Sequence, residues 1–285
     1  MHVIFYRSPK ERCGDFCQHF EAGIRVHGDT FEDRSINGEL ATYHDVAVVL
    51  GVKKARLFAA LKARSVPMVY IDKGYIREWT HRRISIGACQ PSHYLGKWNK
   101  PSDRRLEFGW IFSPWRGPEP WRMKHNGHIL LAWSSPGYHL HMGLPSPEIY
   151  ATEIVKALRN YTNMPIIYRQ KPNQQRIPVP GTTLSAEGTS IEDDLKEARV
   201  MITVGSSVCL QACMLGVPTI VLGDAIGRPI SSHDLYRVET PYLASNIERA
   251  KWLNDLAYCQ WSLKEYASGE AWAHVRLAIL GNIFK

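Results

Sequence analysis

The sequence lacks the long apolar runs of a membrane protein. No uninterrupted apolar stretch approaches the roughly 18 residues that a membrane-spanning helix needs. It also lacks low-complexity tracts, and residues 2–6, HVIFY, have the pattern of a strand at the place where a secretory leader would begin. From these absences we predict a protein with no membrane partner, located in the cytoplasm.

Cysteine is scarce, and its six positions do not form a metal-binding pattern. Cys13 and Cys17 are four residues apart, and so are Cys209 and Cys213, but neither pair has the second pair that a zinc site requires. The chain also has no Asp-x-Asp motif at a predicted strand end. We therefore predict buried thiols in a reducing compartment, and no metal site.

Negative charge is under-represented in the first half of the chain. Residues 1–150 carry 21 Lys and Arg against 14 Asp and Glu, a balance of +7, whereas residues 151–285 carry 14 against 13, a balance of +1. Nine of those cations lie between Lys53 and Arg83. A basic half predicts a polyanionic partner such as nucleic acid. The alternative is a surface whose charge only keeps the protein soluble.

One stretch near residue 200 has the pattern of a ligand-binding βαβ unit. An apolar run at 200–204 predicts a buried strand, and the turn Gly205-Ser206-Ser207 breaks it. Residues 208–215 then predict a short helix that ends at Gly216, and 219–222 predict a second strand. Free N–H groups at such a turn form an anion site, most often for phosphate. Alternatively, a serine of the turn simply caps the helix.

The first half of the chain alternates strands and helices. Strands are predicted at 3–6, 45–50 and 66–71, and helices at 15–26 and 54–64. This order is typical of a doubly wound parallel sheet. Asp15 and Asp72 each follow a predicted strand, at the edge where open α/β sheets bind ligands. Helix capping for Asp15 and an Asx turn for Asp72 are the structural alternatives.

The second half repeats this alternation. Strands are predicted at 128–133 and 165–168, a helix at 146–160, a short acidic helix at 190–198, and further helices that begin at 246, 262 and 268. Arg169 and Lys171 follow the second of these strands. If the strand continues, both side chains lie on one face, where they could neutralise a diphosphate.

Between the two halves, residues 90–127 are rich in proline, aromatic and basic residues. Trp98, Trp110, Trp115 and Trp121 alternate with lysines and arginines. Such a segment can stack on bases and pair with phosphates. It can equally form a small satellite core with cation–π contacts.

The central unit resembles the donor-binding half of GT-B glycosyltransferases. The residues that carry the likeness are Ser206-Ser207, Gln211-Ala212 and Gly216-Val217-Pro218. Further short motifs, Asp72-x-Gly74-Tyr75 and Arg169-x-Lys171-Pro172 among them, resemble phage-encoded proteins assigned as glycosyltransferases and related to capsular polysaccharide transferases. Gln211 departs from the pattern, since the family commonly has an acidic residue there.

The resemblance implies an α/β fold with two Rossmann-type doubly wound domains facing a cleft and with C-terminal helices. We expect an acceptor-binding domain at 1–126, and at 127–285 a nucleotide-sugar-binding domain that carries those helices. The donor, expected to be a UDP-sugar, is a co-substrate, and no cofactor or metal is expected. The residues implied to bind it are Arg169, Lys171, Gly205, Ser206, Ser207, Val208 and Gln211.

The resemblance also implies a catalytic base in the first domain, for which the candidates are Asp72, Asp15 and His93. Proteins of this kind are expected to glycosylate hydroxymethylated pyrimidines in phage DNA, so the implied acceptor is double-stranded DNA in the host cytoplasm. A capsule-type polysaccharide transferase and a sugar-nucleotide epimerase of the same fold remain alternatives. A non-catalytic DNA-binding protein is a third.

Overall fold

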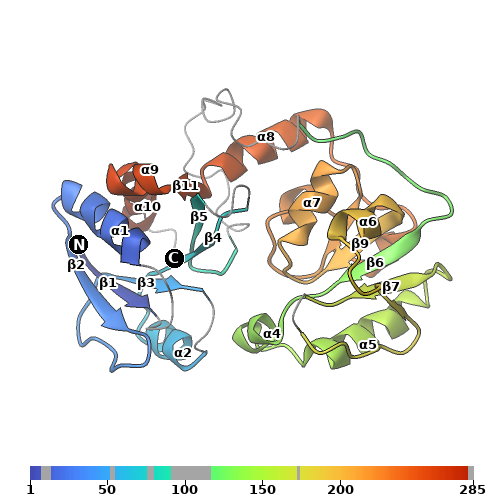
Figure 1. Ribbon diagram of the computed structural model, residues 1–285, viewed down its shortest axis with the longest axis horizontal. Helices are drawn as coiled ribbons and strands as arrows, with labels where there is room; N and C mark the ends of the chain where they lie inside the picture. Colours follow the sequence, from blue (N-terminus) through green and yellow to red (C-terminus); the bar gives the residue numbers. More distant parts are fainter. Residues whose placement is uncertain (8–13, 52–54, 76–79, 91–116, 172–173, 282–285) are drawn as a thin grey trace. The chain divides into compact units, whose positions relative to one another are not determined.

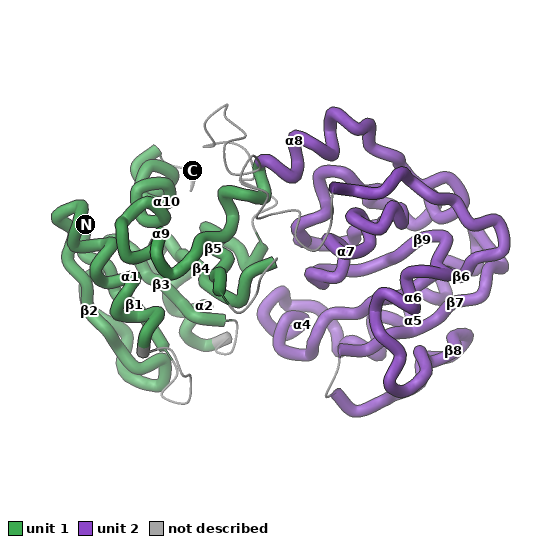
Figure 2. The backbone as a smooth tube through the Cα atoms, turned by 45° about the horizontal axis from the view of Figure 1, so that its top comes forward, with its two compact units in different colours: residues 1–107, 255–285 green, residues 108–254 purple. Residues whose placement is uncertain are grey.

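The structure is a computed structural model that describes residues 1–7, 14–51, 55–75, 80–90, 117–171 and 174–281. The chain divides into two compact units (Figure 2), which are residues 1–107 with 255–285 (unit 1) and residues 108–254 (unit 2). Each unit is a sheet with helices packed on it, so the predicted α/β class is confirmed. In the described residues no helix is long and apolar enough to cross a membrane.

The sheet of unit 1 has six strands in the order β11-β5-β4-β3-β1-β2. These strands are β1 His2–Arg7, β2 Thr30–Ser35, β3 Val46–Leu50, β4 Met68–Lys73, β5 His81–Ile86 and β11 Gln260–Ser262. β1 to β4 pair in parallel, whereas β5 and β11 are antiparallel to their neighbours. The prediction of a purely parallel first domain was therefore wrong at this edge. Helices α1 Gly14–Val26 and α2 Ala55–Ala63 complete the βα alternation.

The sheet of unit 2 is parallel throughout, in the order β10-β9-β6-β7-β8. Its strands are β6 His128–Ala132, β7 Ile166–Arg169, β8 Thr183–Leu184, β9 Ala198–Thr203 and β10 Thr219–Val221. The helices are α4 Pro136–Met142, α5 Pro147–Leu158, α6 Ile191–Lys196, α7 Val208–Met214 and most of α8 Asn246–Ala257 (Figure 1). The chain order 3-2-1-4-5 reverses between β6 and β9. In open α/β sheets, that reversal marks the crevice where ligands bind.

The C-terminal helices α9 Leu263–Ala267 and α10 Glu270–Leu280 belong to unit 1 and lie beside α1 (Figure 1), whereas we expected them in the second domain. The physical reason is aromatic packing. Tyr266 contacts Phe16 and Phe20 edge to face, with centroids 4.9 and 5.5 Å away, and Trp272 contacts Phe20 at 5.9 Å. All four rings are buried in the core on that side of the sheet. α1 and the last two helices therefore share one core.

Candidate functional site

The central βαβ unit forms as predicted. β9 is followed by the Gly205-Ser206-Ser207 turn, α7 and β10. Gly216 has a φ of +70°, as a helix C′ residue requires, and the N–H of Val217 donates to the carbonyl of Ala212 at 2.8 Å. This is a Schellman motif. It ends α7 so that the chain re-enters the sheet at β10.

The N–H groups of the turn are largely engaged within the protein. Gly205 donates to the Ser134 hydroxyl at 3.1 Å, and Ser206 donates to the Thr203 hydroxyl at 3.2 Å. Val208 donates to the Ser206 hydroxyl at 3.3 Å. Ser206 thus accepts from the first residue of the helix, although the N-cap residue is Ser207. Ser207 is exposed and its side chain makes no cap hydrogen bond, which leaves it as the residue of the turn best placed to meet an anion.

Gly205 also brings the ends of β6 and β9 together. A Cβ atom at this position would lie 2.2 Å from the ring of Tyr138, so no larger residue fits without a shift. Tyr138 lies on α4, directly after β6, and its hydroxyl donates to the carbonyl of Asp224 at 3.0 Å. The reversal point of the sheet is therefore tightly packed around the turn.

A cavity of about 240 Å³ opens beside this point, at the carboxyl ends of β6 and β7 and the start of α5. Its charged wall residues are Glu148 and Lys171, so one of the predicted donor-binding residues reaches it. Three glutamine amides and the Ser134 hydroxyl add neutral hydrogen-bonding groups. Trp133, Pro136, Pro147 and Ile177 supply the apolar wall.

Two further wall residues carry buried polar atoms. Trp133 is 3% exposed and Tyr168 is 0% exposed. Neither Trp133 Nε1 nor Tyr168 Oη makes a hydrogen bond of normal geometry with the described residues, although the Gln170 amide lies close enough to Tyr168 Oη to act on it. Burial and then the charge of Glu148 raise the pKa of Tyr168 to about 12, against an opposing influence of the Gln170 amide. The phenol is therefore protonated at neutral pH and able to donate.

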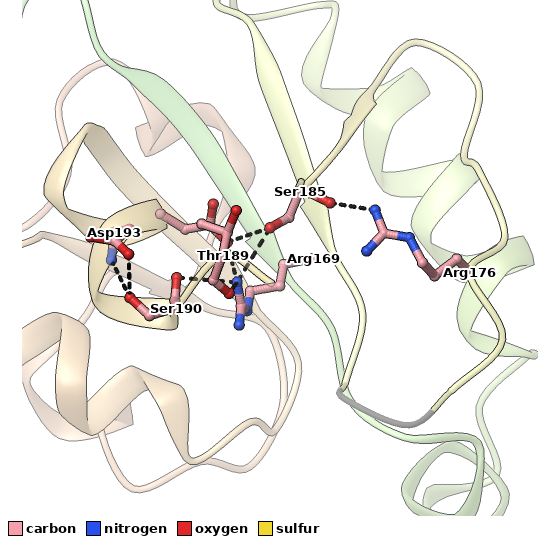
Figure 3. Close-up of polar contacts among 7 residues, drawn as sticks. Arg169, Arg176, Ser185, Thr189, Ser190 and Asp193 are labelled. Atoms are coloured by element: carbon pink, nitrogen blue, oxygen red, sulfur yellow. Dashed lines mark hydrogen bonds and ion pairs between the residues drawn. The ribbon is translucent and has the colours of Figure 1, made fainter. Parts of the chain in front are cut away.

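Arg169 does not share this cavity with Lys171, contrary to the prediction that both lie on one face. β7 ends at Arg169, so the strand alternation does not extend to Lys171. The Arg169 guanidinium donates to Ser185 Oγ at 3.2 Å and to the carbonyls of Thr189 and Ser190 at 3.0 and 3.2 Å (Figure 3). It also forms an ion pair of 2.5 Å with buried Asp194. Arg169 thus anchors the segment before α6.

Gln211 also has a partner within the protein. Its amide nitrogen lies 3.3 Å from a carboxylate oxygen of Glu192, in the first turn of α6. The acidic residues at 192–194 have structural contacts, since Asp193 and Ser190 bond each other and Asp194 binds Arg169. Gln211 is therefore placed to link α6 with α7. In the described residues no group of three or more potential ligands gathers around a metal site.

In unit 1 the candidate base Asp72 is already engaged. One carboxylate oxygen is 2.9 Å from the Arg83 guanidinium, and the other accepts the Lys73 N–H at 2.8 Å. Arg83 also lies over the Tyr75 ring, 5.0 Å from its centroid, and donates to buried Gln90 at 3.2 Å. Asp72 is thus paired within a polar cluster at the end of β4, although its side chain is 43% exposed.

The other two candidate bases are Asp15 and His93. Asp15 is exposed in the first turn of α1, and no described residue pairs with its carboxylate. His93 lies outside the described residues. Asp15 is therefore the described candidate whose carboxylate is available.

Of the tryptophans at 90–127, Trp121 is the one within the described residues, and it forms a satellite core. Its indole N–H donates to the Ala244 carbonyl at 2.7 Å, and its ring lies 4.1 Å from the guanidinium of Arg249. Arg249 is 1% exposed and also donates to the Glu119 and Cys213 carbonyls. Arg249 therefore covers one face of the Trp121 ring within unit 2, as the satellite-core alternative expects. Trp98, Trp110 and Trp115 lie outside the described residues.

No protein-family model matches the chain, and no curated protein matches it. Among solved structures, the β-Kdo 2,4-transferase of Thermosulfurimonas dismutans KpsC is similar over 92% of each chain, with 15% identity and a TM-score of 0.55. The β-Kdo 2,7-transferase of the same protein is similar over 96% of this chain and 99% of its own, with 13% identity and a TM-score of 0.56. At these identities the likeness establishes the fold. It confirms the GT-B-like class predicted from the sequence.

Proposed function

We propose that the protein is a glycosyltransferase that takes a sugar from a nucleotide-sugar donor bound by unit 2. One observation carries the proposal. The sheet order of unit 2 reverses between β6 and β9, and the Gly-Ser-Ser turn and a polar cavity bearing Lys171 lie beside that point. This is where an α/β sheet binds nucleotides. The fold likeness to two transferases with TM-scores above 0.5 supports the same conclusion.

In this proposal Lys171 and the exposed Ser207 contact the phosphate of the donor. Negative charge develops on that phosphate as the bond to the sugar breaks, and a nearby ammonium group stabilises it. The acceptor hydroxyl loses its proton to a carboxylate of unit 1. We assign that role first to Asp15, because Asp72 is engaged by Arg83. Gly205, Ser206, Val208 and Gln211 then shape the site through the contacts described above.

We propose a saccharide hydroxyl as the first acceptor, because the two similar structures described above are Kdo transferases by name, with TM-scores of 0.55 and 0.56. Double-stranded DNA carrying hydroxymethylated pyrimidines is the second candidate, favoured by the +7 balance of residues 1–150. Part of that charge is already neutralised or used within unit 1. Arg83 pairs with Asp72, and Arg64 donates to the Ala41 carbonyl at 2.8 Å.

The test is a transfer assay analysed by mass spectrometry. The purified protein is incubated with UDP-sugars or nucleotide-activated Kdo, and with either oligosaccharide acceptors or hydroxymethylated duplex DNA. We expect a mass increase of one sugar on the saccharide. An increase on the DNA nucleosides instead would establish the second candidate. Conversion of the nucleotide sugar without any acceptor would identify an epimerase and contradict the proposal.

A further inference from the structure

The cavity of unit 2 holds two buried polar atoms that make no hydrogen bond of normal geometry with the described residues. They are Trp133 Nε1, which can only donate a hydrogen bond, and Tyr168 Oη, which can donate and accept. A buried polar atom without a partner lowers stability, and native proteins have few of them. Both side chains line the same cavity. The pair is what a site needs to hold oxygen atoms of a ligand.

The neutral groups around these atoms fit hydroxyl groups. Gln170, Gln174 and Gln175 line the cavity with amides, each of which offers donors and an acceptor. The carbonyl oxygen of Gln170 already accepts the Ile177 N–H at 2.9 Å, which leaves its amino group as a donor. A hydroxyl both donates and accepts, so a ring with several hydroxyls suits such walls.

Glu148 adds a carboxylate to the wall. It lies in the first turn of α5, where the positive end of the helix dipole favours negative charge. Glu148 and Tyr168 line the same cavity, and the negative charge of Glu148 helps to raise the pKa of the phenol. A carboxylate accepts from two neighbouring hydroxyls at once, as acidic residues do with ribose in nucleotide-binding folds.

The volume limits how much of a ligand enters. Pockets for whole drug-sized ligands span about 300–1,000 Å³, and this cavity has about 240 Å³. It therefore has room for one ring rather than for a whole nucleotide sugar. Lys171, which lines the cavity, offers a positive charge to the phosphate of such a ligand.

We propose that this cavity binds a sugar ring carrying a vicinal diol within a phosphorylated ligand. Glu148 accepts hydrogen bonds from the diol, while Trp133 and Tyr168 donate to oxygen atoms of the ring or its substituents. This inference rests on the proposed function for the nature of the ligand. The ring is either the ribose of the donor nucleotide or the sugar that is transferred. Glu148 then provides the carboxylate that the chain lacks at Gln211.

The experiment is calorimetric titration of the full chain and of Glu148→Gln. The probes are UDP and CMP, their 2′-deoxy counterparts, which have no vicinal diol, and UDP-glucose and nucleotide-activated Kdo. If the ring is ribose, Glu148→Gln weakens binding of UDP or CMP by about 10- to 100-fold, because a charged hydrogen bond is lost. The preference of the protein for ribose over 2′-deoxyribose disappears in the same variant.

If the ring is the transferred sugar, Glu148→Gln binds UDP and CMP like the original protein but binds the nucleotide sugar more weakly. Glu153→Gln is the matched control, since Glu153 is an exposed residue of the same helix, and it changes neither affinity. Either pattern supports the inference and identifies the source of the ring.

Tyr168→Phe provides a second, independent readout. It removes one hydroxyl without changing the shape of the ring, so affinity falls about tenfold through one lost hydrogen bond. The melting temperature of the ligand-free variant changes little, because the hydroxyl makes no hydrogen bond of normal geometry there. Tyr161→Phe, at a residue that is 49% exposed, is the control.

The inference is overturned if ligands bind but neither variant changes their affinity, even when sugar transfer is observed. It is also overturned if none of the probes binds, and in that case the proposed function fails with it. Binding that depends on Glu148 and Tyr168, without transfer to any acceptor, leaves the inference standing and removes the proposed function.

Discussion

The two units handle polar side chains at their sheet edges in opposite ways. At the end of β4 in unit 1, hydrogen bonds and an ion pair link Asp72, Arg83, Tyr75 and Gln90 in one paired cluster. In unit 2, the cavity at the carboxyl ends of β6 and β7 contains the Trp133 and Tyr168 polar atoms, which make no hydrogen bond of normal geometry with described residues. Groups that are paired with one another stabilise the fold and have fewer hydrogen bonds left to offer a ligand. Unsatisfied atoms lower the stability of the empty protein and gain their partners when a ligand binds.

The largest expected effect is a difference in kcat between substitutions of the two candidate bases in unit 1, Asp15 and Asp72. Asp15→Asn should lower kcat by about 10²- to 10⁴-fold, because a general base contributes that much to a proton transfer. Asp72→Asn should change kcat far less, because its carboxylate is engaged by Arg83 and the Lys73 N–H. Steady-state kinetics with saturating donor compares them. A large loss confined to Asp72→Asn would contradict the assignment.

At the end of β7 in unit 2, Arg169 is paired within the protein, whereas Lys171 lines the ligand cavity. Arg169→Ala should lower the free energy of unfolding by about 3–5 kcal/mol, because it leaves buried Asp194 without its counter-charge. Lys171→Ala should leave stability nearly unchanged and weaken nucleotide binding. Urea denaturation measures both. Equal stability of the two variants would show that Arg169 is not an anchor.

The buried carboxylate of Asp29 in unit 1 is another paired group, and its contribution to the free energy of unfolding should depend on pH. The carboxylate accepts from the Trp272 indole at 2.7 Å, from Arg276 at 2.9 Å and from the N-terminal amine at 2.6 Å. Burial would raise the pKa of Asp29, but these three donors outweigh it and the pKa is lowered. A lowered pKa in the folded state means that the stabilisation is present above pH about 4 and is lost below it.

Asp29→Asn should therefore cost about 1.5–3 kcal/mol at pH 7, since hydrogen bonds to a charged group are lost. The cost should shrink as the pH falls below 4, where the original protein loses the same stabilisation. Unfolding free energies of both proteins between pH 2 and 7 provide the measurement. A difference that does not depend on pH would contradict the linkage.

The smallest expected effect is a loss of stability from overpacking at Gly205, where the sheet order of unit 2 reverses. Gly205→Ala should cost about 1–3 kcal/mol, the usual penalty for overpacking, because its Cβ would lie 2.2 Å from the Tyr138 ring. Gly137→Ala, where a Cβ meets nothing within 4 Å, is the control and should be neutral or slightly stabilising. Thermal unfolding of the two variants checks the prediction. Equal melting temperatures would show that the turn adapts.

Local patterns predicted the regular elements of the chain well. The apolar run of β9, the glycine at the end of α7 and the helix start at Ser262 all form as expected. Four strands were not predicted: β2, β5, β8 and β11. β2 reads TFEDRS and β5 reads HRRISI, so neither has a continuous apolar run, and β8 and β11 have only two and three residues.

Contacts between distant segments were not predictable from local patterns. The aromatic residues of α9 and α10 carry no sequence signal that assigns them to α1 rather than to unit 2. Lys171 was predicted at the ligand edge, but Trp133, Glu148 and Tyr168 were missed because each has an ordinary core or helix-start pattern. Their common cavity arises only when β6, β7 and α5 come together. Arg169 was assigned to donor binding because its structural partner, Asp194, lies 25 residues away in the sequence and could not be recognised as such.

The central claim is that a nucleotide sugar binds at the edge of unit 2 where the sheet order reverses. Hydrogen–deuterium exchange of the full chain, with and without the tightest-binding probe of the titrations, tests it directly. We predict slower exchange in peptides covering residues 133–138, 166–171 and 203–208, with the β4 peptide 68–75 unchanged. Protection confined to residues 1–75, or no protection in the three segments of unit 2, would contradict the account.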